Sequence, residues 1–160
     1  MGKLDRAVKK MGQEHKVMRR QLKRSVSATS AVAMLRNVIT VKGVLVIVTD
    51  IDSGVKPDDI RAFIDELCNN NPAVVFLVSD QQRETWEDCR LSMSAGVSPD
   101  VEDEGFDAGV WVQMASALVG GAYEGTADRA EGVGAAEDQE HLGRWIEVVR
   151  EYAINKIKEL

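Results

Sequence analysis

Two apolar, β-branched runs on either side of a helical pattern constrain the fold of this chain most strongly. The runs are "GVLVIVTDI" (43–51) and "AVVFLVSD" (73–80). Uninterrupted apolar runs of this length predict strands that are buried on both faces. Between them, Pro57 fits a first helical turn, and apolar residues recur at helical spacing at Ile60, Phe63, Ile64 and Leu67. Strand, helix and strand in this order predict an α/β domain.

The second half of the chain adds further predicted elements. "RLSMSAGV" (90–97) alternates like a third strand, which a hairpin-type turn would pair with the second. "PDVEDEGFD" (99–107) predicts an acidic loop. A helix should follow, marked by Val110, Trp111, Met114, Ala117 and Leu118. A last helix should be marked by Leu142, Trp145, Ile146, Val149, Ala153, Ile157 and Leu160. We therefore expect a small sheet of about three strands covered by helices. Core or anchor positions are predicted for Trp86, Trp111 and Trp145.

The first 35 residues predict a helical arm that precedes a globular domain over 36–160. Residues spaced by four and three in alternation form an apolar seam typical of a heptad repeat: Leu4, Val8, Met11, His15, Met18 and Leu22. His15 is best explained as a tolerated polar residue on this seam. The seam spans fewer than three heptads, so two alternatives stay open. It could pair with a second chain as a short coiled coil, or it could pack within its own chain.

Charge separates the arm from the rest of the chain. Residues 1–24 hold nine Lys or Arg and two acidic residues, a net charge of +7. The whole chain carries −6, so the other 136 residues carry −13. The heptad pattern places the basic residues of the arm on its outer face. A polyanion should therefore meet the arm first.

The residue types that would build an active centre are scarce. The two histidines, His15 and His141, lie in the two terminal helical segments, and no H-x-x-x-H or Ser-centred motif occurs. Cys68 and Cys89 form no C-x-x-C and are predicted to be small buried apolar groups. The acidic cluster from Asp100 to Asp107 lacks the ligand spacing of a calcium loop. We expect no catalytic residues and no metal site.

Neither a signal peptide nor a membrane span is expected. The basic start is followed by polar residues, and no apolar run approaches about 18 residues. We expect a cytoplasmic protein. The chain begins inside a helical pattern, so we also expect it to be a piece of something longer.

The stretch "GGAYEGTADRAEGVG" (120–134) is unusually rich in glycine. One interpretation is that the glycines only let the chain turn. The other is that they expose backbone N–H groups for close approach of an anionic ligand. No Lys-Ser/Thr pair follows, so the stretch is not a P-loop. The spacing alone favours the turn.

These motifs together resemble the C-terminal, DHH-associated domain of alanyl-tRNA synthetases. "SAGVSPD" (94–100) matches the end of a strand in that family, and 120–134 aligns without gaps with its loop "GGKGGGRPDMAQGGG". "FIDELCNNNPAVVFLV", "IDSG" and "LDRA" are similar to a eukaryotic cytosolic form. The resemblance covers roughly 36–160. Where the family has Lys, Gly, Gly, Arg and Gln, this chain has Ala122, Tyr123, Glu124, Thr126 and Glu131.

The resemblance implies a non-catalytic module that holds the elbow of alanine-specific tRNA and supports dimerisation. Aminoacylation and editing centres, with ATP and zinc, would belong to N-terminal parts of a parent alanine–tRNA ligase. A related phosphoesterase role is not expected, because its Gly-Gly-Gly-His motif is missing. A membrane or DNA partner is not expected either.

The resemblance and the charge pattern together nominate tRNA-binding residues in the arm and in the glycine-rich stretch: Lys9, Lys10, Arg19, Arg20, Gly120, Gly121, Tyr123, Gly125 and Arg129. Gly125→Val is expected to loosen tRNA binding at unchanged stability. The altered stretch has lost positive charge, so the alternative is a protein–protein module that no longer binds RNA and dimerises through the seam.

Overall fold

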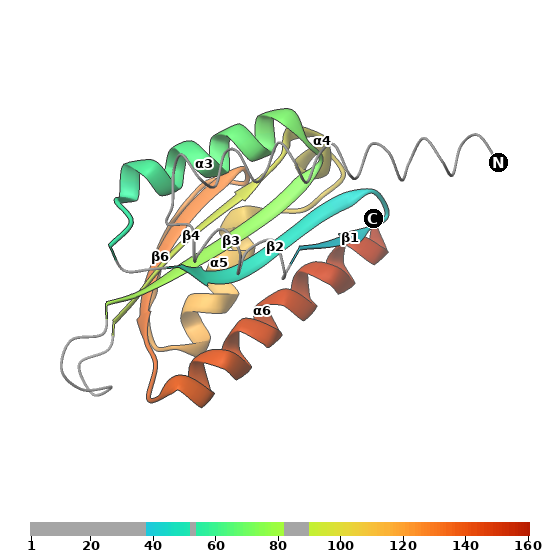
Figure 1. Cartoon of the computed structure of the whole chain (residues 1–160). Helices are drawn as coiled ribbons and strands as arrows, with labels where there is room; N and C mark the ends of the chain where they lie inside the picture. Colours follow the sequence, from blue (N-terminus) through green and yellow to red (C-terminus); the bar gives the residue numbers. More distant parts are fainter. Residues whose placement is uncertain (1–37, 52–53, 82–89) are drawn as a thin grey trace.

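The computed structural model describes residues 38–51, 54–81 and 90–160, which form a six-stranded sheet covered by helices on both faces (Figure 1). The strand order is β1-β2-β3-β4-β6-β5. Of the five strand pairs, only the pair of β2 (Val44–Ile51) and β3 (Ala73–Gln81) is parallel. The α3 helix (Pro57–Asn70) connects these two strands. The α/β fold expected from the two apolar runs is confirmed.

The two central strands are buried on both faces because each side of the sheet has its own apolar core. Alternate residues of β2 and β3, such as Leu45 and Val75, face α3, whose own side chains Phe63 and Leu67 are fully buried. The intervening residues face a larger core beneath α5 (Ala108–Leu118) and α6 (Gln139–Glu159). A helix on either side explains why these two strands are continuously apolar in sequence.

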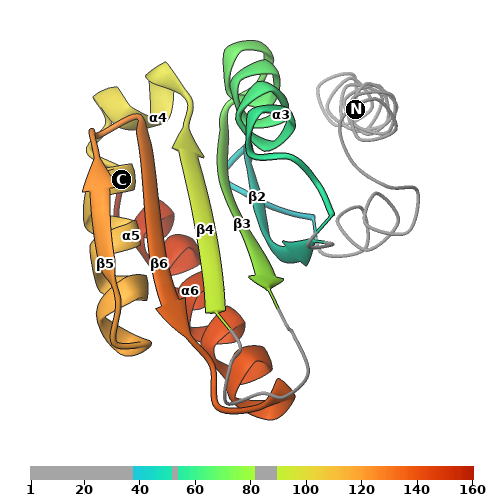
Figure 2. The same ribbon diagram turned by 90° about the vertical axis from the view of Figure 1, so that its left-hand side faces the viewer.

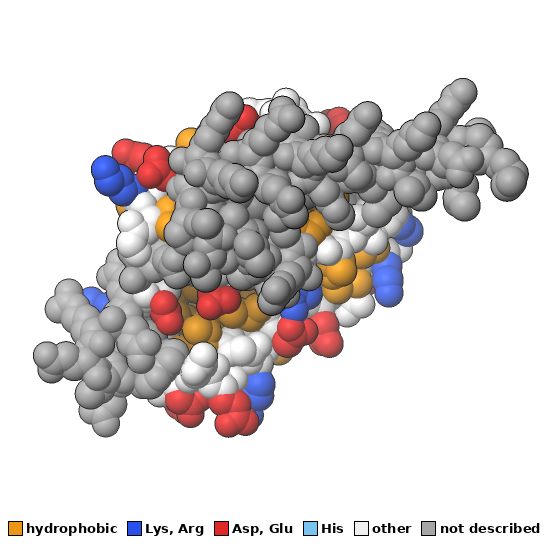
Figure 3. Space-filling view, viewed as in Figure 1, with side chains coloured by type: hydrophobic (Ala, Val, Ile, Leu, Met, Phe, Trp, Pro, Cys, Tyr) orange, Lys and Arg blue, Asp and Glu red, His pale blue; other side chains and the backbone are white. Residues whose placement is uncertain are grey.

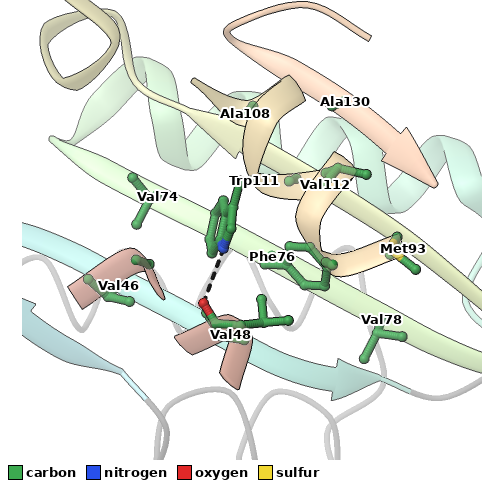
Figure 4. Close-up of a cluster of buried hydrophobic side chains, with 14 of the residues drawn as sticks. Val46, Val48, Val74, Phe76, Val78, Met93, Ala108, Trp111, Val112 and Ala130 are labelled. Atoms are coloured by element: carbon green, nitrogen blue, oxygen red, sulfur yellow. Dashed lines mark hydrogen bonds between the residues drawn. The ribbon is translucent and has the colours of Figure 1, made fainter. Parts of the chain in front are cut away.

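Two tryptophans anchor the larger core. Trp111 and Trp145 pack on Phe76, with ring centroids 5.2 and 5.7 Å away. Figure 4 shows Trp111 beside Phe76 in this core. Their indole N–H groups reach backbone oxygens: Trp111 Nε1 donates to Val149 O at 3.1 Å, and Trp145 Nε1 donates to Ala115 O at 2.9 Å. These bonds join α5 to α6 and satisfy polar groups inside the core. The predicted core positions of both residues are confirmed, whereas Trp86 lies outside the described residues.

The sheet has six strands where about three were predicted. The third predicted strand is confirmed as β4 (Arg90–Val97), antiparallel to β3. The three missed strands are β1 (Ile39–Val41), β5 (Ala122–Gly125) and β6 (Arg129–Ala135). The first is only three residues long and turns into β2 through Lys42 and Gly43, both at positive φ (51° and 79°). The other two contain three glycines among eleven residues, and glycine has a low strand propensity.

The second half of the chain holds two smaller differences from the prediction. The expected acidic loop begins with a short helix, α4 (Pro99–Asp103), because Pro99 suits the first position of a helix. In α5 the apolar face is rotated from the predicted one. Trp111, Val112 and Ala115 are buried, whereas Val110 and Leu118 are exposed at 48% and 53%. The last helix is confirmed, with five of its predicted residues buried: Leu142, Trp145, Val149, Ala153 and Ile157.

Among the residues that the structure describes, no helix has the length and apolar character to cross a bilayer. In the same residues, no three His, Cys, Asp or Glu side chains gather in a way that could hold a metal ion.

Candidate nucleic-acid interface

The glycine-rich stretch is a β-hairpin rather than an irregular loop. Its strands β5 and β6 pair antiparallel from Ala122–Val133 to Gly125–Ala130, and β6 joins β4 in the main sheet. The hairpin therefore extends the sheet, and β5 becomes its edge strand (Figure 2). All four β5 residues are exposed.

Gly120 ends the preceding helix. It has a φ of +64°, and Gly121 N donates to Ser116 O at 2.9 Å while Gly120 N donates to Ala117 O at 3.4 Å. This pair of bonds is a Schellman motif, in which a left-handed residue just past the helix end is usually glycine. The turning role proposed from the sequence is thus observed at Gly120.

Other glycines of the stretch allow close packing. A Cβ on Gly121 would lie 1.6 Å from Val133 O, and a Cβ on Gly134 would lie 2.2 Å from Val119 Cγ2. Gly125 has a φ of +146°, and its Cβ would lie 2.4 Å from Ala130 Cα. The expectation that Gly125→Val leaves stability unchanged is therefore wrong, because a side chain there strains the backbone and overlaps β6.

The tip of the hairpin is fixed by its own polar groups. Thr126 Oγ1 donates to Asp128 Oδ1 at 2.6 Å, and Thr126 N donates to Arg129 O at 2.7 Å. The hydroxyl bond lowers the pKa of Asp128. Thr126 thus closes the turn.

Arg129 is tied to three groups of the body. Its guanidinium donates to Asp65 Oδ1 at 2.7 Å, to Val97 O at 3.1 Å and to Asp128 O at 2.7 Å. The Arg129 side chain is 30% exposed. Arg129 therefore fastens the hairpin to α3 and to the end of β4.

Tyr123 and Arg129 were both nominated as RNA contacts, but they lie on opposite faces of the hairpin. In the register, Tyr123 is opposite Gly132 and Arg129 is opposite Gly96. Residues 129 and 132 of one strand point to opposite sides, so Arg129 faces α3 and Tyr123 faces the side of α5. Tyr123 is 43% exposed at the edge. Gly125 lies with Tyr123 in the edge strand β5, and Gly120 and Gly121 come just before this strand.

A groove runs between α3 and the hairpin, on the sheet face opposite α5 and α6. It consists of two hollows of about 380 and 470 Å³. Both hollows are lined by Arg61, Ser94, Glu124 and Glu131. Apolar side chains complete the walls: Val55, Ile60, Ile64, Ala122 and Val133.

An ion pair crosses this groove. Arg61 Nε lies 2.6 Å from Glu131 Oε1, and Arg61 NH2 lies 3.2 Å from Glu131 Oε2. The hydrogen bond to Glu131 and its charge raise the pKa of Arg61. Sequence reasoning missed both residues as part of a site. The one available signal was Glu131 itself, a carboxylate within the glycine-rich stretch.

The charge of the described body is strongly negative. Residues 38–51, 54–81 and 90–160 hold twenty Asp or Glu and nine Lys or Arg. Acidic side chains are spread over the visible surface around α6 (Figure 3). Within the groove, Glu124 is exposed and has no ion pair with another described residue. The body alone therefore offers a polyanion little electrostatic attraction.

The remaining nominated residues cannot be placed. The cations Lys9, Lys10, Arg19 and Arg20 lie outside the described residues. So do Cys89 and the seam residues Leu4, Val8, Met11, His15, Met18 and Leu22. Cys68 is described and is 2% exposed, and burial raises the pKa of its thiol to about 12. The prediction that Cys68 is a small buried group is confirmed.

Comparisons with known proteins point to one family. No match was found among the curated proteins. The crystal structure of the C-Ala domain from Aquifex aeolicus alanyl-tRNA synthetase has the same fold, with a TM-score of 0.56 at 20% sequence identity. The match covers 71% of this chain and 95% of that one. The family model of the DHHA1 domain matches residues 42–155, well over half of the chain. This chain therefore belongs to the DHHA1 domain family.

Proposed function

We propose that this chain is the C-terminal, non-catalytic module of an alanyl-tRNA synthetase and that it binds the elbow of alanine-specific tRNA. Family membership and the fold shared with a C-Ala domain support the parentage. The observation that carries the RNA-binding part is the glycine hairpin, which presents an exposed edge strand with an exposed aromatic ring, Tyr123.

The hairpin suits a folded RNA better than a regular duplex. Proteins read folded RNA by its shape and by stacking on unpaired bases. Tyr123 offers a ring for stacking, and the edge strand offers backbone groups that β6 does not use. The cations of the arm, Lys9, Lys10, Arg19 and Arg20, would supply the attraction to phosphate that the acidic body lacks.

The parent protein would be a cytoplasmic alanine–tRNA ligase of protein biosynthesis. Its ATP-dependent aminoacylation would take place in other parts of that protein. The role of this module is then to hold the tRNA while the reacting end is handled elsewhere.

The direct test compares two RNAs on the full chain. One is an alanine-specific tRNA, and the other is the same tRNA with the contacts between its D and T loops disrupted. We expect the intact tRNA to bind more tightly in fluorescence anisotropy titrations at two salt concentrations. Equal affinity for both RNAs would show that the elbow is not recognised.

A second candidate function is a protein–protein module that no longer binds RNA. The exposed face of α5 favours it, because that helix contains no charged residue and leaves Val110 and Leu118 exposed. Uncharged apolar patches of this kind are common at protein interfaces. A full chain that forms dimers in sedimentation and binds neither RNA would favour this function over the first.

A further inference from the structure

One face of the sheet is only half covered. The α3 helix packs on β3 and β4, whereas α5 and α6 lie on the opposite face. Beside α3, no described helix covers the outer part of this face, formed by β4, β6 and β5 (Figure 2). The groove described above lies in this uncovered part, and Val133, which lines one of its two hollows, is 55% exposed.

The groove has the size and lining of a helix-binding site. Its strand β6 has seven residues, a length of about 23 Å. Val55, Ile60 and Val133 give it apolar walls, and Ser92 and Ser94 of β4 lie on its floor. The carboxylate of Glu124 stands unpaired at its rim among the described residues. A helix lying here would be a neighbour of α3 on the same sheet face.

We propose that residues 4–22 of this same chain dock in the groove as a helix, with the apolar seam turned toward the sheet. Nineteen helical residues span about 28 Å, close to the length of β6. The seam residues Leu4, Val8, Met11, Met18 and Leu22 need an apolar partner, and Val55, Ile60 and Val133 provide one.

The connection is long enough for docking within one chain. The described structure starts at Val38, next to β1 at the opposite edge of the sheet. From β1 to β6 is four strand spacings, about 19 Å. Residues 23–37 can span up to about 50 Å when extended.

Charge also favours this occupant. The arm carries +7, and the described body has eleven more acidic than basic residues. Arg19, next to the seam, would be available to Glu124 at the rim of the groove. A second body or another acidic protein would be repelled from the same groove.

Docking would also bring positive charge to the hairpin. The stretch 120–134 holds one cation, Arg129, and three carboxylates, Glu124, Asp128 and Glu131. With its seam in the groove, the arm would present its basic outer face beside β5 and β6, so that arm and hairpin form one RNA-binding surface. Only this consequence rests on the proposed function. The docking itself does not.

The test measures access to the groove in the full chain. Val133→Cys places a thiol in the groove, in a Cys89→Ser background. Cys68 stays silent, because it is buried and its pKa is about 12. Val148→Cys, on exposed α6, is the control site on the opposite face.

The rate of maleimide labelling is then measured for each thiol, with and without Met11→Asp on the seam. Gln13→Asp, the same charge change on the outer face, is the matched control, and thermal midpoints verify folding.

We expect Met11→Asp to raise the labelling rate at V133C by about tenfold, as for an arm that is docked some nine-tenths of the time. Gln13→Asp should not raise it, and V148C should label alike in all backgrounds. If the V133C thiol is protected from labelling equally at all protein concentrations, the arm docks within its own chain. Protection that appears only at high concentration would assign the groove to a second copy and overturn the proposal. So would a V133C rate that Met11→Asp leaves unchanged. No RNA is present, so either failure leaves the proposed tRNA binding untouched.

Discussion

Single glycines decide how the hairpin is built. Gly120 ends α5 at positive φ. Gly121 packs directly against the backbone of Val133, and Gly134 packs against Val119. The sequence predicted that the glycines would allow a turn. It could not show the close contacts, because those depend on which segments meet in space.

The first prediction compares two glycine substitutions. Gly121→Ala should lower the free energy of unfolding by about 2 kcal/mol, because its Cβ would lie 1.6 Å from Val133 O. Gly143→Ala should raise it by about 0.5–1 kcal/mol, because this helical glycine has open space around its Cβ. Urea unfolding measures both. Equal effects of the two substitutions would contradict the packing described here.

The second prediction concerns the pH dependence that Cys68 causes. Its pKa is about 12 in the folded chain and near the ordinary thiol value when unfolded. The unfolded chain therefore releases the proton first, so stability should fall as the pH rises from about 9 toward 12.

Cys68→Ala isolates this contribution. Its unfolding free energy should fall less steeply between pH 9 and 10.5 than that of the wild type, whose other titrating groups are unchanged. The cavity left by the substitution costs the same at each pH. Parallel curves for the two proteins would refute the assignment.

At the scale of elements, the strands that could be predicted are those whose burial leaves an apolar pattern in the sequence. The strands β2 and β3 are buried on both faces, so their apolar runs were readable from the sequence. The strands β5 and β6 give no such signal, because they contain glycine and charged residues such as Gly125, Gly132 and Glu131. These strands form because β6 pairs with β4 and both strands pack against α5. No local pattern records that pairing. The face of α5 was misplaced for a related reason, since an apolar residue such as Leu118 can remain at the surface.

The third prediction concerns the attachment of the hairpin to α3. Arg129→Gln should lower the free energy of unfolding by about 1–2 kcal/mol, because it removes charge-assisted bonds to Asp65, Val97 O and Asp128 O. Arg90→Gln, at the exposed start of β4, should change it by less than about 0.5 kcal/mol. Thermal or urea unfolding of both variants decides. An effect no larger at Arg129 than at Arg90 would mean that Arg129 is not structural.

At the scale of the whole molecule, the main feature is the separation of charge. A basic arm precedes an acidic body, and the glycine-rich stretch 120–134 holds a single cation, Arg129. The sequence predicted this separation. It could not predict the groove, which exists only because α3 covers part of one sheet face and leaves the hairpin side open.

The central claim is that the chain binds tRNA with the arm supplying the phosphate contacts. The most direct measurement is the dependence of tRNA affinity on salt, for the full chain and for two fourfold Gln variants. One variant changes Lys9, Lys10, Arg19 and Arg20. The matched variant changes four cations of the body: Arg90, Arg144, Lys156 and Lys158.

Each phosphate contact contributes about 0.7–0.9 to the slope of log affinity against log salt. We predict a steep slope for the wild type that becomes flatter by about 3 in the arm variant. The body variant, with the same net charge, should keep nearly the full slope. Equal slopes for the arm variant and the wild type, or no tRNA binding at low salt, would contradict the account.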